Sequence, residues 1–333
     1  MKFVYVVTCD AQSYYAEQAY VSMYSLRKHN PGCHIVFATE AETLKTFTGN
    51  RARILDLVDE LITVDVPDEF SMVQRSRYIK TSIRQRVEGD FLYIDCDTVI
   101  MGSLADLDSV EDDVCAIRIQ DSYDWSEENS HYWLEIYNSK KGVPLGENYG
   151  VSEYYNGGVI LAKDTEKARA FYDTWHKLWL EDSTKYKFNL DQCSLWRANR
   201  LNNTVIKEIS GIYNCPILCP IIALRYVYDC KVFHYHSNSI ELKQFRLKNP
   251  ELLKRMLDPE NESELNDLIA TARREYLIGL KVFVSPDLYK WMDSPLVGVA
   301  RVISGKLPII DKLLTKLYRV YARVIDKRPK LER

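Results

Sequence analysis

Short apolar runs alternate with helix-length segments through the first hundred residues, and this alternation limits the possible folds more than any other feature. The pattern predicts strands at 3–8, 34–38, 61–64 and 91–94, with helices at 14–29 and 76–87. Strands that are apolar on both faces are typical of parallel sheets buried between helices. The alternation therefore predicts an α/β fold in which ligands bind beyond the carboxyl ends of the strands.

Composition and charge narrow the class of protein. The chain has 333 residues, of which 46% are hydrophobic and 27% charged, as in globular proteins rather than disordered or collagen-like ones. A net charge of -3 gives no support for a nucleic-acid partner. No apolar run approaches the roughly 18 residues that span a bilayer, and the first apolar run is too short for a signal peptide. We expect a cytoplasmic protein whose 8 cysteines are reduced thiols, because no C-x-x-C pair occurs.

Two aspartates follow the apolar run at 91–94 directly, as Asp95-Cys96-Asp97. At this spacing both carboxylates fall on one side of an extended backbone. Such oxygen-rich pairs suit Mg²⁺ or Mn²⁺, which can in turn hold a diphosphate, although a solvated turn at the strand end is an alternative. A second copy, Asp106-Leu107-Asp108, has no predicted strand before it, and we expect it to lie in a solvated loop. The first copy therefore predicts a divalent-cation site.

A second group of polar residues is His234-Tyr235-His236, at the end of a strand predicted over 231–236. Alternation along a strand places both imidazoles on one face. A neutral imidazole can complete a Mn²⁺ site begun by two carboxylates. Hydrogen-bonded histidines in a polar strand end are an equally good interpretation of this pattern alone.

These pieces resemble, in their order, the nucleotide-sugar glycosyltransferases of the GT-A fold, most closely glycosyltransferase family 8. The resemblance spans roughly residues 1–237. It is carried by Val7-Thr8-Cys9-Asp10 with Tyr14-Tyr15, Arg77-Tyr78-Ile79-Lys80, Tyr93-Ile94-Asp95-Cys96-Asp97-Thr98, Tyr155-Asn156-Gly157-Gly158-Val159, Leu190-Asp191-Gln192 and Phe233-His234.

The resemblance implies a fold, a domain division and an activity. Residues 1–245 would form a GT-A-type, Rossmann-like domain with a mixed, mainly parallel sheet flanked by helices. Beyond Phe245 the sequence itself becomes helical in pattern, Leu-rich and increasingly basic, so we expect residues 246–333 to form a helical, basic C-terminal extension. The activity would be transfer of a hexose from a UDP-sugar to a glycan or lipid-linked acceptor, in the synthesis of lipopolysaccharide or another surface polysaccharide. Family 8 enzymes retain the anomeric configuration, so the resemblance implies retention.

The resemblance also implies a metal site and a nucleotide site. Asp95 and Asp97 would hold Mn²⁺, or Mg²⁺, and His234 would join them. Four residues after the first strand would meet the uracil ring by contact or by stacking: Thr8, Asp10, Tyr14 and Tyr15.

The sugar and the phosphates would meet a further set of residues. Arg77 would contact the donor, with Lys80 helping, and Asn156 would lie near the donor sugar. Asp191 and Gln192 would be the catalytic pair that holds the sugar hydroxyls. Of these two, Gln192 would lie close to the reacting carbon.

The chain departs from the family after His234. The family's His-x-x-Gly-x-x-Lys-Pro-Trp ending is absent, so the lysine that would bind the diphosphate is unassigned. His236 could also replace His234 as the metal ligand, although the register of the match favours His234.

Two other functions stay open on the sequence. A strand followed by Asp95-x-Asp97-x-Val99 also fits the haloacid-dehalogenase signature, in which the first aspartate is a phosphorylated nucleophile. That family places its signature near the start of the domain, whereas several elements come first here. A non-catalytic nucleotide-sugar-binding adaptor on the same scaffold would also explain the missing ending.

The C-terminal tail has a composition of its own. Residues 295–333 hold ten Lys or Arg and three Asp or Glu, and apolar residues recur at helical spacing between 310 and 325. A basic amphipathic helix of this kind is predicted to lie on an anionic membrane surface, although packing against the protein body is an alternative. We therefore expect a peripheral protein on the cytoplasmic face. Four aromatic residues could line an acceptor cleft: Trp125, Tyr132, Trp133 and Tyr154.

Overall fold

The computed structural model describes residues 1–119, 134, 137–138, 141–143, 154–217, 225–235, 245–279, 295, 310 and 316. The chain divides into two compact units, Met1–Asp121 with Ser130–Phe283, and Ser122–Asn129 with Val284–Arg333. Almost all described residues belong to the first unit. The tail helix lies outside the described residues, except for Ile310 and Lys316, as do Trp125, Tyr132 and Trp133.

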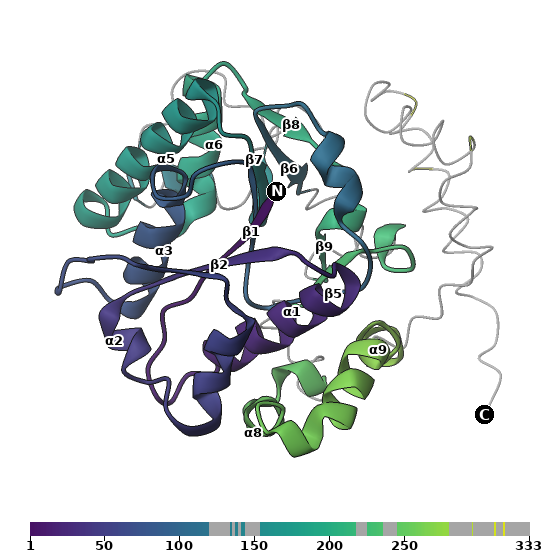
Figure 1. The fold of residues 1–333 in the computed structure, drawn as a ribbon. Helices are drawn as coiled ribbons and strands as arrows, with labels where there is room; N and C mark the ends of the chain where they lie inside the picture. Colours follow the sequence, from purple (N-terminus) through teal and green to yellow (C-terminus); the bar gives the residue numbers. More distant parts are fainter. Residues whose placement is uncertain are drawn as a thin grey trace. The chain divides into compact units, whose positions relative to one another are not determined.

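A seven-stranded mixed sheet forms the centre of the first unit, in the order β3-β2-β1-β4-β7-β6-β8 (Figure 1). Its strands are β1 Lys2–Val6, β2 His34–Thr39, β3 Glu60–Thr63, β4 Phe91–Ile94, β6 Val114–Arg118, β7 Tyr155–Ala162 and β8 Ile206–Glu208. The strands β1 to β4 pair in parallel, whereas β7 runs antiparallel to both β4 and β6. The expected α/β fold with a mainly parallel sheet is confirmed.

Helices cover both faces of this sheet, because β1 is apolar on both sides. Phe3 and Tyr5 pack in one core with α1 (Tyr15–His29), whereas Val4 and Val6 pack in another with residues of α3, α5 and α6. The bounds of these three are α3 Met72–Thr81, α5 Glu166–Lys185 and α6 Asp191–Leu201. The core around α1 also takes in α8 (Pro250–Arg255) and α9 (Glu262–Gly279).

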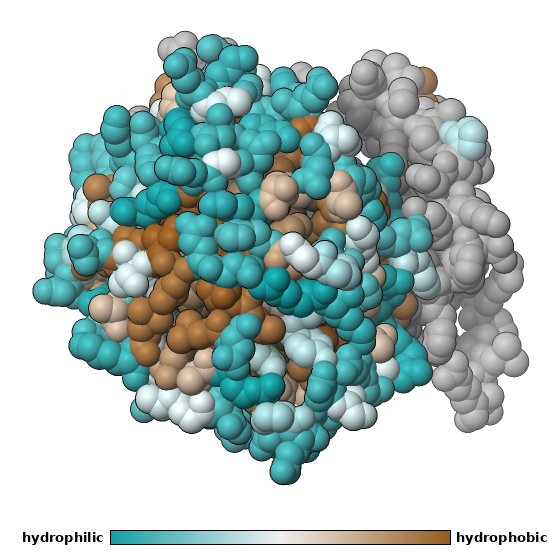
Figure 2. Space-filling view, in the orientation of Figure 1, coloured by the Kyte–Doolittle hydropathy of each residue, from teal (hydrophilic) through white to brown (hydrophobic). Residues whose placement is uncertain are grey.

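The remaining elements are short. They are α2 Ala41–Leu44 and the 3₁₀ helices η1 Gly49–Leu57, η2 Ile83–Gln85, η3 Ala105–Ser109, η5 Gly211–Tyr213, η7 Arg246–Lys248 and η8 Pro259–Asn261. None of the helices in the described part is both long and apolar enough to cross a bilayer. Figure 2 shows hydrophilic residues over most of the visible face, interrupted by a patch of hydrophobic residues.

A small second sheet positions the predicted histidine. It has the order β5-β10-β9, with β5 Thr98–Ile100, β9 Cys215–Pro216 and β10 Val232–His234. β10 pairs antiparallel with β5, so that His234 stands opposite Thr98, next to the Asp-x-Asp segment. The observed strand is three residues long, shorter than the run predicted from the sequence.

The helix before β4 begins and ends earlier than the predicted range of 76–87. Ser71 caps its first turn, because its hydroxyl accepts a hydrogen bond from Gln74 N and Ser71 N donates one to Gln74 Oε1. At the other end, the hydroxyls of Thr81 and Ser82 bond back to carbonyls of the preceding turn. Since α3 is continuous between these points, Arg77 and Lys80 lie on one helix face, three residues apart.

Candidate metal and donor site

The polar residues predicted for the site come together at the carboxyl end of β4. β7 runs antiparallel to β4, with Ile94 opposite Val159, so the start of β7 lies beside the end of β4. Asp95 N donates a hydrogen bond to Gly158 O at 2.7 Å, which fixes the chain where the Asp-x-Asp segment begins. The site is therefore built where two antiparallel strands meet, at the edge that the sequence predicted.

Asp95, Asp97 and His234 form a cluster that could hold a metal ion. One ligand atom from each lies within 4.8 Å of the others. His234 Nε2 lies 3.2 Å from Asp97 Oδ1, and the two side chains are 6% and 15% exposed. Burial lowers the pKa of His234, but the negative charge of Asp97 outweighs it and raises the pKa overall. Two carboxylates and one imidazole in this arrangement fit a divalent cation such as Mn²⁺.

Gly158 gives this cluster the room that it needs. A Cβ atom at this position would lie 2.3 Å from His234 Cε1 and 2.9 Å from Asp95 Oδ2. Both distances are shorter than van der Waals contact allows, and neither neighbour is the end of a long flexible chain. A side chain at this position would therefore displace two of the three candidate ligands.

Lys80 is buried beneath the cluster and orients Asp95. Its side chain is 3% exposed, and Nζ lies 2.9 Å from Asp191 Oδ2 and 3.4 Å from Asp95 Oδ1. Nζ also stands 4.9 Å from the ring centroid of Tyr93, whose hydroxyl donates to the same Asp95 Oδ1. Because two donors hold Oδ1, the carboxylate of Asp95 keeps one orientation, in which Oδ2 lies near Gly158 and His234.

Asp191 differs from the metal cluster in being neutralised by two cations. Arg77 Nε lies 3.1 Å from its Oδ1, on the other side from Lys80. Burial raises the pKa of Asp191, but the positive charges of Lys80 and Arg77 outweigh burial and lower it to about 2. As the first residue of α6, this carboxylate also lies at the positive end of a helix dipole.

The two predicted catalytic residues lie beside the start of β7. A Cβ atom at Gly157 would lie 3.4 Å from Asp191 Oδ2, 3.4 Å from Lys80 Nζ and 3.9 Å from Gln192 Cγ. These are ordinary contact distances, unlike those at Gly158. Gly157 therefore faces the Asp191–Lys80 ion pair and Gln192, whereas Gly158 faces the candidate metal cluster.

The residues predicted to meet the uracil ring lie between the end of β1 and the start of α1. Thr8 is buried and its hydroxyl donates to Met72 O at 3.0 Å, which ties this loop to α3. Asp10 is exposed, and its Oδ1 accepts hydrogen bonds from the backbone of the following turn. The rings of Tyr14 and Tyr15 stack with centroids 6.0 Å apart, and Tyr15 is 47% exposed. Burial raises the pKa of Tyr15, with smaller contributions from neighbouring groups that include Asp97.

Lys248 is a residue that the sequence did not single out. It lies in η7, which reaches β10 because Phe245 packs against Phe233 and Tyr235 with ring centroids 6.1 Å apart in each pair. The side chain is half-buried, and burial lowers the pKa of Lys248 against an opposing effect of the Asp97 charge. Lys248 has no ion pair with a carboxylate in the described part of the chain, so its charge is available to a ligand.

The structure bears on two further predictions, His236 as an alternative metal ligand and Tyr154 as a residue of an acceptor cleft. His236 lies outside the described residues, so His234 is the histidine seen at the cluster. Tyr154 is 1% exposed and packs in a core with Trp196 and Phe188, so the prediction that it lines an acceptor cleft is wrong.

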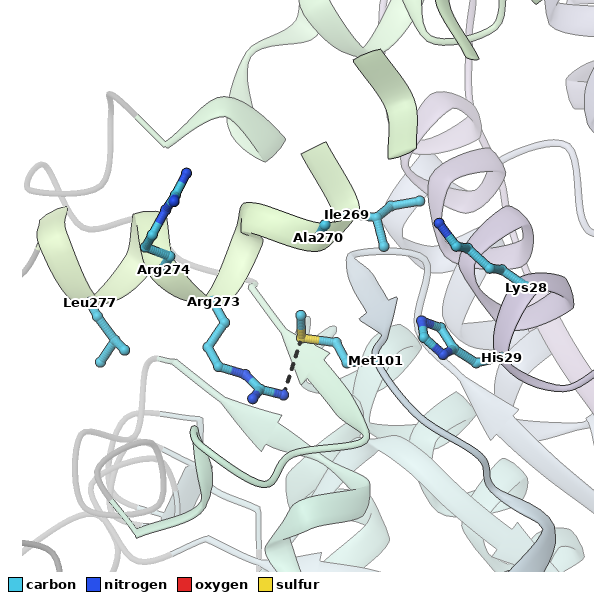
Figure 3. Close-up of a pocket in the computed structure, with 8 residues that line it drawn as sticks. All are labelled: Lys28, His29, Met101, Ile269, Ala270, Arg273, Arg274 and Leu277. Carbon is cyan, nitrogen blue, oxygen red and sulfur yellow. Dashed lines mark hydrogen bonds between the residues drawn. The ribbon is translucent and has the colours of Figure 1, made fainter. Parts of the chain in front are cut away.

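A separate pocket of about 430 Å³ lies between α1 and α9 (Figure 3). Lys28 and His29 line it from α1, and Arg273 and Arg274 from α9. Arg273 Nη2 donates to Met101 Sδ at 3.8 Å inside the pocket. No carboxylate is among its lining residues, so it is a basic and apolar surface distinct from the acidic site.

Comparisons with known proteins bear on the fold. No family model and no curated protein sequence matches the chain. The apo structure of WbbM, a bifunctional glycosyltransferase, matches 80% of this chain and 51% of its own, with a TM-score of 0.53 and 15% identity. The glycosyltransferase GlyE of Streptococcus pneumoniae TIGR4 matches 82% of this chain and 64% of its own, with a TM-score of 0.48 and 20% identity.

A galactosyltransferase, LgtC, solved with donor and acceptor sugar analogues, matches 79% of this chain and 100% of its own, with a TM-score of 0.49 and 17% identity. The chain thus spans about half of WbbM and about two thirds of GlyE. The WbbM match shows that the chain shares the fold of about half of a glycosyltransferase. The expected GT-A-type fold is confirmed by this match and by the mixed sheet described above.

Proposed function

We propose that this chain is a metal-dependent glycosyltransferase, similar to family 8, that moves a hexose from a UDP-sugar to a glycan or lipid-linked acceptor. The observation that carries the proposal is the convergence of Asp95, Asp97 and His234 at the carboxyl end of β4. Ligands bind at this edge in open α/β sheets. The fold shared with WbbM supports the same activity class.

Asp95, Asp97 and His234 would hold Mn²⁺ or Mg²⁺, which when bound neutralises the charge that develops on a diphosphate leaving group. The residues around them have the complementary task of placing the donor. Lys80 and Arg77 hold the Asp191 carboxylate in its ionised form, in which it can accept hydrogen bonds from sugar hydroxyls.

Gln192 follows Asp191 and lies beside Gly157, which has no side chain to block an approaching sugar. We assign Gln192 to the reacting carbon, Asp191 to the sugar hydroxyls and Asn156 to the donor sugar. Retention of configuration is part of the proposal and follows from the family resemblance.

The uracil and the diphosphate of the donor would meet different residues. The exposed ring of Tyr15, stacked on Tyr14, offers a face for the uracil, and Thr8 and Asp10 lie on the same loop. Lys248 would contact the diphosphate, because it is a half-buried cation in η7, and the neighbouring Phe245 packs against Phe233 and Tyr235 on either side of His234. It would replace the lysine of the family ending that this chain lacks.

An activity screen tests the proposal against its alternatives. The protein is incubated with Mn²⁺ and a panel of UDP-sugars, and release of UDP is measured with and without the metal. Metal-dependent release from one sugar donor is expected. Release of phosphate from small phosphoesters would support the phosphatase instead, and nucleotide binding without turnover would support the adaptor.

The basic tail carries a separate part of the proposal, peripheral binding to an anionic membrane that holds the acceptor. The observation that supports it is the excess of ten basic over three acidic residues in 295–333. Deleting residues from Pro308 onward is expected to abolish cosedimentation with acidic liposomes. Unchanged cosedimentation of the shortened protein would contradict this part.

A further inference from the structure

His234 is held by a series of hydrogen bonds that crosses from the large sheet to the small one. The series begins at Gly158 N on β7, passes through the side chains of Asn156 and Asn214, and ends at His234 Nδ1. All four residues are buried. Buried polar groups depend on their protein partners, so each of these bonds has a strong influence on the next.

The direction of each bond is fixed by the one before it. Gly158 N lies 2.7 Å from Asn156 Oδ1, and a backbone amide only donates, so this end of Asn156 is the oxygen. Asn214 Nδ2 lies 2.9 Å from the same oxygen, so Asn214 turns its NH₂ group toward Asn156. Asn214 Oδ1 then lies 3.0 Å from His234 Nδ1, and an amide oxygen requires a proton on that nitrogen.

A proton on Nδ1 decides which nitrogen of the neutral ring keeps its lone pair. That nitrogen is Nε2, which lies 3.2 Å from Asp97 Oδ1. Without a cation Nε2 donates its own proton to this carboxylate, and a bound cation would replace that proton, so Nε2 is the ring nitrogen left to bind a metal beside the two carboxylates.

We propose that Asn156 and Asn214 are positioning residues that hold His234 in the Nδ1–H tautomer and direct Nε2 into the metal site. This inference rests on the proposed function, because it assumes that the cluster binds a cation. It gives Asn156 a second role, since its carboxamide oxygen already accepts two hydrogen bonds inside the protein. Partners of this kind typically change metal affinity by about 10- to 100-fold when they are removed.

The tautomer can be measured without metal or donor. Two-bond ¹H–¹⁵N spectra of the ¹⁵N-labelled, metal-free protein are recorded at the pH of the Mn²⁺ titration, and His234→Gln identifies the signals. A protonated Nδ1 is expected, whichever state Nε2 has beside Asp97. An unprotonated Nδ1 in the wild-type protein would overturn the proposal.

Mn²⁺ titration of three variants measures the consequence. Asn214→Leu is expected to bind Mn²⁺ about 10- to 100-fold more weakly and to show a mixture of tautomers. Asn156→Asp keeps an oxygen that accepts from both Gly158 N and Asn214, and is expected to retain the proton on Nδ1. Asn199→Ala is the matched control, because Asn199 is also fully buried and its Oδ1 accepts from Ile206 N at 2.8 Å.

The outcomes separate this inference from the proposed function. Wild-type affinity in Asn214→Leu, or an equal loss in Asn199→Ala, would overturn the positioning role. If Asn214→Leu does not fold, Asn156→Leu takes its place and the wild-type tautomer still decides. A wild type that shows the expected tautomer but binds no Mn²⁺ would contradict the metal site, while the hydrogen-bond assignment would stand.

Discussion

The same Asp-x-Asp pattern occurs twice in this chain, and the two copies have different surroundings. Asp106 and Asp108 lie in η3 with side chains 50% and 56% exposed. Lys231 Nζ lies 2.6 Å from Asp106 Oδ2, and the N-terminal ammonium lies 3.0 Å from Asp108 Oδ1. Each carboxylate of this copy is therefore neutralised by its own cation.

Asp95 and Asp97 differ from the second copy in their ionic partners and in their burial. Asp95 shares Lys80 with Asp191, and Asp97 contacts the imidazole of His234. Both side chains are less than a quarter exposed, so water screens their charges less than it screens those of Asp106 and Asp108. The spacing of two residues is common to both copies; the burial and the sharing of one cation distinguish the first copy, which is the candidate metal site.

The largest effect is expected from the first copy itself. Asp97→Asn removes one anionic ligand and is expected to weaken Mn²⁺ binding by more than about 100-fold, because a carboxylate supplies most of its affinity through charge. Isothermal titration of the metal-free protein with Mn²⁺ measures the change. Asp106→Asn is the matched control, and a comparable loss in it would show that the two copies do not differ as described.

The two adjacent glycines allow the packing of the cluster to be tested. Gly158→Ala places a Cβ where His234 Cε1 and Asp95 Oδ2 already lie, and is expected to weaken Mn²⁺ binding by about 50-fold, within the range for displaced ligands. Gly157→Ala meets only ordinary contacts and should change Mn²⁺ affinity by less than about threefold. Equal affinities in the two variants would argue against the close packing of the ligands.

Asp191 is a buried carboxylate with two cations, and its stability contribution depends on pH. Its pKa in the folded protein is about 2, below the ordinary value of 3.8, so it stabilises the fold above about pH 4 and loses this effect as the pH falls toward 2. The shift corresponds to about 2 kcal/mol. Urea unfolding of the wild type and Asp191→Asn is expected to show a stability difference that shrinks between pH 5 and pH 2.5, whereas a constant difference would contradict the ion pairs.

Substitution of Lys248 is expected to lower the affinity for UDP without changing the affinity for Mn²⁺. Lys248→Ala is expected to weaken UDP binding in the presence of Mn²⁺ by about tenfold, or about 1.4 kcal/mol, through loss of one charge-assisted contact. Mn²⁺ affinity without UDP should stay within twofold. Lys254→Ala is the control, since Lys254 is exposed and pairs with Glu251. Equal UDP affinity in Lys248→Ala and the wild type would remove Lys248 from the site.

The smallest effect is expected from the second copy. Asp106→Asn breaks an exposed ion pair with Lys231, and such pairs contribute about 0.2–1 kcal/mol. Thermal unfolding at low salt is expected to show a loss in this range, which decreases as salt screens the pair. A loss of several kcal/mol would mean that the second copy is a structural centre rather than a surface pair.

Local patterns were enough to predict the first strands and the two aspartates of the candidate metal cluster. The apolar run at β4 ends at the residue before Asp95, and a buried strand with charged residues directly after it is a strong local signal. The start of α3 was missed, although Ser71 and Gln74 have the spacing of a capping box. The strands β6 and β8 were not predicted from the sequence either.

The supporting residues of the site could not be predicted, because their partners are distant in the chain. Asn214 bonds to Asn156, 58 positions away, and to His234, 20 positions away. The segment that holds Lys248 reaches β10 because Phe245 packs against Phe233 and Tyr235. Neither residue belongs to a motif, so only the folded structure identifies them.

The central claim is that Asp95, Asp97 and His234 bind one divalent cation. Pulsed electron paramagnetic resonance of the protein with one equivalent of Mn²⁺ and UDP tests it directly, since a nitrogen bound to the metal gives a ¹⁴N coupling. One bound Mn²⁺ with a single coupled nitrogen is expected in the wild type, and loss of that coupling in His234→Gln. A spectrum of free hydrated Mn²⁺, or a nitrogen coupling that persists in His234→Gln, would contradict the account.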